Sequence, residues 1–337
     1  MAAVSYGGMD PLTGPGLAPL PPGDGPPPDP SAEPAGFVVA TEDAVRIHFL
    51  DWDGGTGTGA NRASRAPGVL LLHGLASTAW SWTPVARRLH ASARVVAMDL
   101  RGHGLSDAPT DGYDPDALAG DAISVAEGAG LLALPGDPPG GPLVLAGIGY
   151  GAIVAAWAAH ALGDRCDGLV LVDGGWEDLA AATQATPEEW LAAIEEPPEV
   201  LASMAAWLAD REAFDPASWD ADEERAARAQ VVETAAGRVK LAVHPHALAG
   251  SVRAIWSYDP AAILPRVEAR IAVLIARDDD GSRAVALRRV ARLRAAAGGS
   301  PVLAAAFPER GHNLARYEPN ATAAAVLAVA SGATMRP

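Results

Sequence analysis

Four short motifs contain the glycine, histidine and aspartate residues that are most able to do chemistry. In chain order they are residues 72–75 (Leu-His-Gly-Leu), 99–107 (Asp-Leu-Arg-Gly-His-Gly-Leu-Ser-Asp), 147–151 (Gly-Ile-Gly-Tyr-Gly) and 311–313 (Gly-His-Asn). Histidine and aspartate side chains move protons or orient the groups that do, and glycine lets the chain turn sharply. Each motif lies at or shortly after the C-terminal end of a short apolar run, and open α/β sheets place their sites at the C-terminal ends of their strands. The motifs therefore predict one site along one edge of a sheet.

The elements that must position these motifs are strands and helices in alternation. From residue 36 onward, short β-type apolar runs alternate with helical stretches. Runs that are apolar along their whole length are typical of parallel strands covered by helices on both faces. The pattern predicts an α/β fold with a mostly parallel, doubly wound sheet. Two earlier runs, residues 37–40 and 45–50, are joined by a short turn and should pair antiparallel. The predicted parallel strands are residues 69–72, 95–98, 143–146, 169–172, 271–276 and 302–307.

One long segment interrupts this alternation. Residues 176–256 are rich in tryptophan, have helical character and contain no convincing strand. We therefore expect a helical insertion that lies over a core formed by residues 36–175 and 257–337. The predicted helical stretches of the insertion are residues 188–196, 200–210 and 217–234.

The N-terminal residues 1–35 differ in composition from the rest of the chain. They are rich in proline, glycine and aspartate. A proline-rich stretch holds neither a helix nor a central strand, because proline lacks a backbone N–H. These residues are predicted to be a disordered tail.

Charge and cysteine content exclude several classes of function. The net charge of -16 and the pI near 4.8 argue against binding to nucleic acid or to an anionic membrane surface. No apolar run reaches the ~18 residues of a membrane span, and the N-terminus lacks the pattern of a signal peptide. The single cysteine, Cys166, allows no disulfide within the chain. We expect a cytoplasmic protein, and nothing in the sequence indicates its oligomeric state.

No metal and no cofactor are expected. The pair His244 and His246 lacks a credible third metal ligand nearby in the sequence. No glycine-rich phosphate loop or dinucleotide motif follows a strand in the required context. The expected partner is instead a small apolar molecule, bound in a pocket lined by Trp80, Trp82 and the tryptophans of the insertion.

The ordered set of motifs resembles the α/β-hydrolase family, over about residues 36–332. The resemblance implies that the insertion is a cap domain and that His312 is the general base, although a surface-loop histidine is the alternative. It also implies that the backbone N–H groups of Leu75 and Tyr150 form an oxyanion hole. His73 and His103 fall in motifs that the family uses for loop shape, and we interpret them as structural.

The glycine-rich motif departs from the family at its central position. The family places a nucleophile, usually serine, in the pattern Gly-x-nucleophile-x-Gly at a sharp turn called the nucleophile elbow. Gly147 and Gly151 match the flanking glycines, but Gly149 stands at the nucleophile position. A glycine forms no covalent acyl-enzyme, and it adopts the positive-φ backbone of such a turn without steric cost.

The acid that would orient His312 has more than one candidate. The family usually ends the strand before this acid with Gly-x-x-Asp, and counting from Ala276 in the glycine position gives Asp279, with Asp280 next. Some members place the acid one strand earlier, where Asp173 follows residues 169–172. We expect Asp279 to be the acid and keep Asp280 and Asp173 as alternatives.

These residues support two functional hypotheses. In the first, His312 and an aspartate activate a water molecule that hydrolyses an apolar, ester-like or related substrate without a serine nucleophile. In the second, the protein is a non-catalytic family member that binds a small ligand or a partner protein. A third interpretation is that Gly149 is a recent replacement in an ordinary serine hydrolase.

Overall fold

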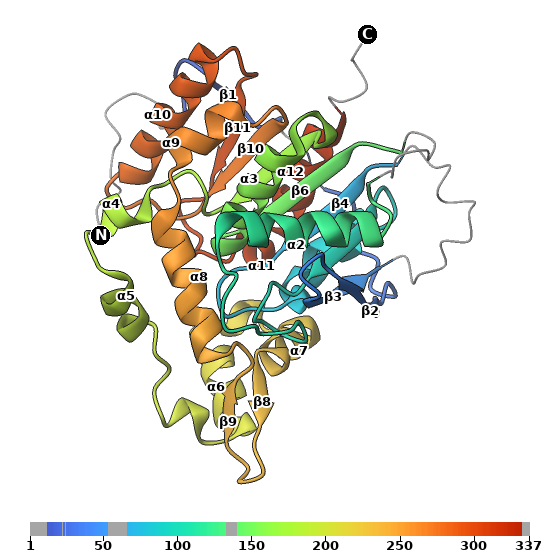
Figure 1. Cartoon of the computed structure of the whole chain (residues 1–337), viewed down its shortest axis with the longest axis vertical. Helices are drawn as coiled ribbons and strands as arrows, with labels where there is room; N and C mark the ends of the chain where they lie inside the picture. Colours follow the sequence, from blue (N-terminus) through green and yellow to red (C-terminus); the bar gives the residue numbers. More distant parts are fainter. Residues whose placement is uncertain (1–11, 22, 24, 53–65, 133–139, 332–337) are drawn as a thin grey trace.

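A nine-stranded sheet forms the centre of the molecule, with the strand order β1-β11-β10-β7-β6-β4-β5-β3-β2 (Figure 1). The computed structural model describes residues 12–21, 23, 25–52, 66–132 and 140–331. Neighbouring strands pair parallel, except that β3 runs antiparallel to both β2 and β5. The strands are β1 (Leu17–Pro19), β2 (Ala35–Ala40), β3 (Arg46–Asp51), β4 (Gly68–Leu72), β5 (Arg94–Met98), β6 (Leu143–Ile148), β7 (Gly168–Val172), β10 (Arg270–Ile275) and β11 (Val302–Ala306).

The predicted parallel strands are confirmed as β4, β5, β6, β7, β10 and β11. The predicted antiparallel pair is confirmed as β2 and β3, with Phe37 opposite Phe49. All of these parallel strands except the partly buried β11 are almost fully buried because helices cover both faces of the sheet, which is why their sequences are continuously apolar rather than alternating. The mostly parallel, doubly wound α/β fold is therefore established.

Two helical layers enclose the sheet. Leu70 and Leu72 of β4 pack into one core with residues of α2 and α3, whereas Val69 and Leu71 pack into the other core with α1 and α12. Adjacent residues of a strand point to opposite faces, so each strand contributes to both cores. The helices of this α/β part are α1 (Thr83–Leu89), α2 (Pro115–Gly128), α3 (Tyr150–Leu162), α10 (Ser282–Ala296), α11 (Leu314–Tyr317) and α12 (Pro319–Ser331). Within the described ranges, no helix has the length and apolarity needed to cross a bilayer.

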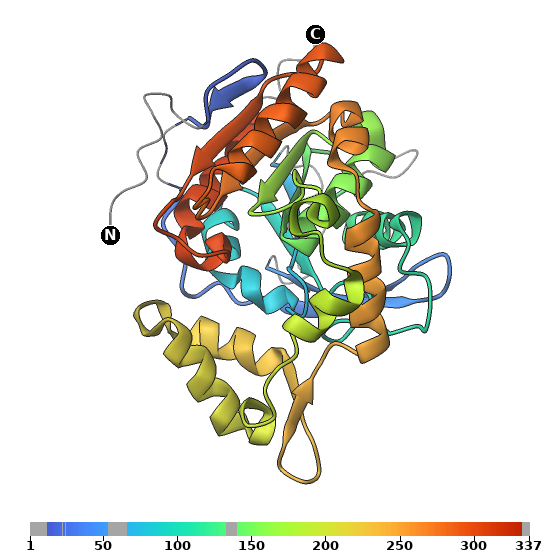
Figure 2. The ribbon, with the colours of Figure 1, turned by 90° about the vertical axis from the view of Figure 1, so that its left-hand side faces the viewer.

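The chain between β7 and β10 forms a mostly helical cap that extends from one end of the sheet (Figure 2). One expectation is wrong here, because the cap contains an antiparallel hairpin of β8 and β9. Each strand has only three residues, too few for a strand periodicity to show in the sequence. The hairpin is held by Val231 and Val239, which pack on Trp207. The elements are α4 (Leu179–Thr183), α5 (Pro187–Ala193), α6 (Met204–Phe214), α7 (Ala221–Ala229), β8 (Val231–Glu233), β9 (Val239–Leu241), α8 (Pro245–Ser257) and α9 (Pro260–Ile263).

The N-terminal segment also differs from the prediction of a disordered tail in residues 1–35, as far as it is described. Residues 1–11, 22 and 24 lie outside the described residues. The remainder places β1 parallel to β11, with the N–H of Leu20 donating to the carbonyl of Ala304 at 2.9 Å. Proline is compatible with an edge strand, because the N–H that it lacks is not needed for a hydrogen bond to a neighbouring strand. The proline- and glycine-rich composition of this segment therefore did not predict its short strand.

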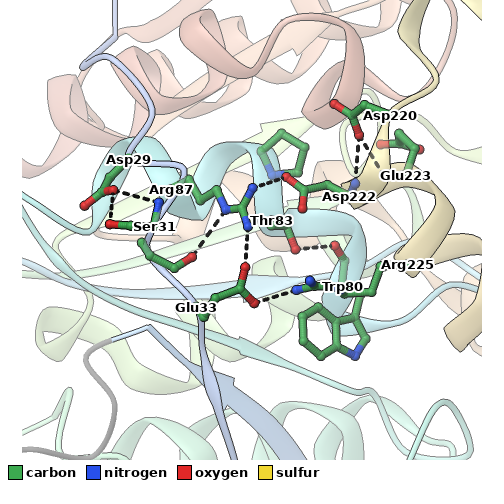
Figure 3. A network of polar contacts seen from close by, with 12 residues as sticks. Asp29, Ser31, Glu33, Trp80, Thr83, Arg87, Asp220, Asp222, Glu223 and Arg225 are labelled. Atoms are coloured by element: carbon green, nitrogen blue, oxygen red, sulfur yellow. Dashed lines mark hydrogen bonds and ion pairs between the residues drawn. The ribbon is translucent and has the colours of Figure 1, made fainter.

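An ion-pair network joins this N-terminal segment to both the core and the cap, as Figure 3 shows. Arg87 of α1 donates to the carboxylate of Asp222 in α7 at 2.6 Å and also pairs with Glu33. Glu33 pairs in turn with Arg225 of α7 at 2.6 Å, and the Arg225 guanidinium lies over the ring of Trp80. One carboxylate near the N-terminus thus contacts arginines from both parts of the molecule.

A second contact between cap and core involves Glu223, whose carboxylate lies 3.2 Å from the guanidinium of Arg316. Burial raises the pKa of Glu223 to about 7; Arg316 opposes this shift, and Asp220 and Asp222 add to it. Between pH 4.5 and about 7 the folded protein keeps a proton on Glu223, whereas the unfolded chain has already lost it. Folding is therefore favoured at low pH. Stability should fall as the pH rises from about 4.5 to about 7.

We predict that Glu223→Gln reduces this loss of stability, because the amide stays neutral at every pH. The free energy of unfolding, measured by urea denaturation between about pH 5 and pH 8, should decline less in the variant than in the parent. Glu224→Gln, on the exposed side of the same helix, is the matched control and should keep the parent's pH dependence. Equal slopes in the parent and in Glu223→Gln would contradict the assignment.

Candidate active site

The turn between β6 and α3 has the sharp geometry of a nucleophile elbow. Gly149 occupies the position before the first helical residue, with φ +54° and ψ −114°. Its N–H donates to the carbonyl of Val172 at 3.1 Å, which fixes the turn against the end of β7. Such a backbone is strained for any residue that has a side chain. The glycine therefore suits this conformation.

The glycines on either side are required by close contacts. A Cβ at Gly147 would lie 2.2 Å from the carbonyl oxygen of Gly151, and a Cβ at Gly151 would lie 2.2 Å from that of Leu72. Both separations are far below van der Waals contact, so neither position accepts a larger residue without a shift of the backbone. The start of α3 can therefore lie directly against the end of β4.

His312, in the loop after β11, faces the elbow. A Cβ built on Gly149 would lie 3.0 Å from Nε2 of His312 and 3.3 Å from Cε1. On the other side of the ring, Nδ1 donates to Oδ2 of Asp173 at 2.6 Å. The carboxylate fixes the proton on Nδ1, so that the lone pair of Nε2 faces Gly149. The His312 side chain is 63% exposed, and its ring is reached from the pocket.

Asp173 is the buried anchor of this pair. It follows β7 with φ +46°, an unusual backbone for a residue with a side chain. Its Oδ1 accepts the N–H of Ala276 at 2.7 Å and Nη1 of Arg283 at 2.7 Å. Burial opposes ionisation of this carboxyl, but the hydrogen bond from His312 and the charge of Arg283 outweigh it and hold the pKa of Asp173 below its usual value. The carboxylate is therefore ionised at neutral pH.

The structure does not bring Asp279 or Asp280, the acids favoured by the sequence count, to His312. Asp279 is 85% exposed and its nearest cation is Arg277, at 3.9 Å. Asp280 accepts the N–H of Ser282 at 2.9 Å. The count from Ala276 leads into a turn that starts α10 rather than into the site. The position of Asp173 in the sequence was the better indication of the acid, since Asp173 follows β7 just as Gly149 follows the neighbouring strand β6.

Leu75 and Tyr150, the predicted oxyanion-hole residues, line the same pocket as Gly149 and His312. Tyr150 is the first residue of α3, so its N–H has no acceptor one turn earlier in the helix. The positive end of the helix dipole lies at the same place, which favours negative charge on a bound group. The backbone here suits an anion or a polarised carbonyl oxygen.

A pocket of about 780 Å³ opens above these residues and extends under the cap. Trp190 and Trp207 of the cap line it, as expected. The other expected tryptophans are not among its described lining residues: Trp80, Trp82, Trp176, Trp219 and Trp256. Trp82 is fully buried in the core beside α1, and Trp80 carries the Arg225 contact. The aliphatic lining residues include Ile148, Ile153, Leu179, Leu241, Leu248 and Ile255.

The charged side chains of the pocket were not predicted from the sequence. Arg283 pairs with both Asp173 and Glu177, and Arg211 pairs with Glu196 at 2.7 Å. Burial raises the pKa of Glu177, although Arg283 opposes that shift. No motif marks these residues: Arg283 and Glu177 are 106 positions apart, and Arg211 and Glu196 lie 15 positions apart in different segments of the cap.

Three other histidines, His73, His103 and His246, contact backbone carbonyl groups of loops. His73 accepts the N–H of Leu100 through Nε2 at 3.0 Å, and its Nδ1 lies 2.7 Å from the carbonyl oxygen of Gly74. Burial lowers the pKa of His103 to about 3, and the adjacent His73 adds to the shift. His246 contacts the carbonyl oxygen of Ala108 at 3.1 Å. Within the described part of the chain, no three His, Cys, Asp or Glu side chains are grouped as a metal site requires.

Comparison with known proteins agrees with this fold. The chain matches the alpha/beta hydrolase family over residues 69–326, and it belongs to that family. Epoxide hydrolase 4 of Mus musculus is 33% identical over 104 residues, which make up 30% of this chain and 26% of that protein. The 2-(acetamidomethylene)succinate hydrolase of Mesorhizobium japonicum is 37% identical over 70 residues, 20% of this chain and 25% of that protein. The chain thus aligns with about a quarter of the length of these relatives.

Solved structures match over a much larger part of the chain. The crystal structure of E-2-(acetamidomethylene)succinate hydrolase has a TM-score of 0.65 and 21% identity, covering 87% of this chain and 97% of that one. The thioesterase domain from the curacin biosynthetic pathway has a TM-score of 0.63 and 20% identity, covering 87% and 99%. At these identities the likeness shows the fold and no shared activity.

We predict that Gly149→Ser lowers the free energy of unfolding by roughly 1–3 kcal/mol, because a side chain at this φ is strained. The His312 ring must also move by a few tenths of an ångström to accept the new Cβ. Gly120→Ser is the matched control, since Gly120 lies inside α2 and a Cβ there would have no heavy atom within 4 Å. A Gly149→Ser midpoint equal to that of the parent in urea denaturation would rule out a strained elbow.

Proposed function

We propose that this protein hydrolyses a small, mostly apolar, ester-like substrate through a water molecule activated by His312. In this proposal Gly149 takes the place of the family's nucleophile, so that no covalent intermediate forms on the elbow. The observation that carries the proposal is the arrangement of His312: its ring is held by Asp173, and its Nε2 faces the side-chain-free Gly149 at the floor of the pocket.

The proposed reaction is a direct addition of water. Nε2 of His312 accepts a proton from water while the water oxygen bonds to the carbonyl carbon of the substrate. The carbonyl oxygen becomes an oxyanion, which the N–H groups of Leu75 and Tyr150 stabilise. As the bond to the leaving oxygen breaks, His312 returns its proton to that oxygen. The products are a carboxylic acid and an alcohol.

Asp173 supports this cycle in its ionised form. The carboxylate accepts the Nδ1–H of His312 and stabilises the imidazolium that forms when Nε2 takes the proton. Because its pKa is held below the usual value, the carboxylate stays charged throughout the neutral pH range.

The position of the His312 ring restricts where the water can bind. Nε2 already lies 3.0 Å from the point that a serine Cβ would occupy, so the ring fills part of that space. A water that bonds to Nε2 must therefore approach from the pocket side. That side is also where the substrate carbonyl would lie.

The lining of the pocket supports an apolar substrate. Aliphatic side chains and two cap tryptophans form much of its wall. Its charged lining residues are largely paired: Glu196 with Arg211, and both Asp173 and Glu177 with Arg283. The relatives include proteins named epoxide hydrolase, and an epoxide is a second apolar electrophile that water could open in this pocket.

The missing side chain at Gly149 also supports a second candidate function, a protein that only binds its ligand. The pocket and the backbone N–H groups of the elbow could bind a ligand without catalysing a reaction. The two candidates differ in one measurable property, which is turnover that depends on His312.

We predict that the parent hydrolyses a short-chain aryl ester slowly and that His312→Ala lowers kcat/KM by about 10²–10⁴-fold, the usual contribution of a general base. Initial rates at neutral pH provide the measurement. His244→Ala, at the start of α8, is the control and should retain the parent's rate. Absence of turnover in the parent, together with turnover in Gly149→Ser, would favour the binding protein.

A second prediction separates the candidate acids. Asp173→Asn should lower kcat/KM by roughly 10²–10⁴-fold, because the amide no longer holds His312 in the required tautomer. Asp279→Asn changes an exposed carboxylate and should leave the rate unchanged. The same initial-rate assay applies, with the melting midpoint as a check on folding. A larger loss in Asp279→Asn than in Asp173→Asn would reverse the assignment.

A further inference from the structure

The loop after β10 places an arginine against Asp173. Oδ2 of Asp278 accepts the N–H of Ala284 at 2.9 Å, and Oδ1 accepts the N–H of Arg283 at 3.3 Å. Together with the bond from Ser282 to Asp280, these contacts fix the first turn of α10. The aspartate-rich segment therefore serves to hold Arg283 in place, although the sequence suggested that it supplies the acid itself.

Arg283 spans two carboxylates from the segment after β7. Nη1 donates to Oδ1 of Asp173 at 2.7 Å, and Nε donates to Oε2 of Glu177 at 2.9 Å. The guanidinium carbon lies 5.1 Å from the centre of the Trp176 ring. The planar guanidinium is thus held on two edges and against one aromatic face, which leaves it little freedom to rotate.

The two oxygens of Asp173 have different partners. Oδ1 accepts from Ala276 and Arg283, whereas Oδ2 accepts from His312. Rotation of the carboxylate about its Cβ–Cγ bond moves both oxygens together, so any turn that took Oδ2 away from the imidazole would also break the contacts of Oδ1. The direction of the bond to His312 therefore depends on what holds Oδ1.

We propose that Arg283 is a positioning residue for the catalytic pair: it holds the Asp173 carboxylate so that Oδ2 faces Nδ1 of His312, and Glu177 holds Arg283. The catalytic role of Arg283 rests on the proposed function, because His312 needs a fixed orientation only if it acts as the general base. The structural role, in which Arg283 controls the hydrogen bond between Asp173 and His312, can be tested whether or not the protein is an enzyme.

The alternative role for Arg283 is to bind an anionic group of the substrate directly. Its contacts argue against this, because Nη1 and Nε already donate to Asp173 and Glu177, and Nη1 also lies 3.4 Å from the carbonyl oxygen of Arg277. Nη2 also lies 2.9 Å from Oε2 of Glu177, so an incoming carboxylate would have to share the guanidinium with Asp173 and Glu177. A cation in the first turn of a helix is also opposed by the helix dipole, so its place there depends on the two carboxylates.

The test uses the proton on Nδ1 of His312, which a short bond to a carboxylate moves far downfield in the proton NMR spectrum of histidine-¹⁵N-labelled protein. The signal is assigned by its loss in His312→Ala. We expect Arg283→Gln to abolish or shift this signal while the protein remains folded. In acid, the signal should disappear at a higher pH in the variant, because the charge of Arg283 lowers the pKa of Asp173.

Arg277→Gln is the matched control. Arg277 lines the same pocket, but its side chain pairs with Asp279 at 3.9 Å and is largely exposed. The control should keep the parent's signal. An unchanged signal in folded Arg283→Gln, or an equal loss in Arg277→Gln, contradicts the proposal.

Arg283→Lys keeps the proposal testable if the glutamine variant does not fold. A lysine can reach one carboxylate but lacks the fork that holds both, so the signal should persist and be lost at a pH between those of the parent and a neutral variant. A lysine variant identical to the parent in this titration overturns the proposal.

Kinetics supply a separate readout. For a positioning residue, Arg283→Gln should lower kcat by up to about 10²-fold through misorientation and leave KM nearly constant. An arginine that binds the substrate would instead raise KM. If the parent has no turnover, the proposed function fails, but the NMR result still decides whether Arg283 orients the pair.

Discussion

The buried carboxylate of Asp173 is the interaction on which the geometry of the site depends. It directly follows β7, accepts the backbone N–H of Ala276 directly after β10, and binds side chains from α10 and from the loop after β11. Four segments of the chain therefore meet at one side chain. A buried charge of this kind is stable only when its hydrogen bonds are made, so the segments are held in register by the same contacts that keep the carboxylate ionised.

The elbow and the cap complete the pocket in different ways. At the elbow, the close approaches of Gly147 and Gly151 bring the start of α3 against β4. The position of the backbone N–H groups there does not depend on side chains. The cap instead reaches the core through arginine contacts, with Glu33 and Arg316 on the core side. The floor of the pocket is thus fixed by the sheet, whereas ion pairs join the cap above it to the core: the pair of Glu223 with Arg316 is buried, and the pair of Glu33 with Arg225 is exposed.

The sequence predicted the strands and the elbow because these features are local. Continuous apolar runs mark buried parallel strands, and the spacing of Gly147, Gly149 and Gly151 marks the turn. It did not predict which aspartate meets His312, because that choice depends on how the turn after β10 folds back onto α10. The hairpin β8–β9 and the ordered part of the N-terminal segment were missed for a related reason: their residues gain order from packing on Trp207 and pairing with β11. Composition carries no information about such partners.

The short strand β1 has a consequence for contacts between molecules. An open sheet exposes a row of unpaired N–H and carbonyl groups along its last strand, and another chain can extend the sheet there. In this protein the row on β11 is occupied by Leu17–Pro19, which is only three residues long and ends in a proline. A strand this short, with no N–H at Pro19, is a poor template for further pairing. The N-terminal segment thereby protects the β11 edge from the association that leads to aggregation.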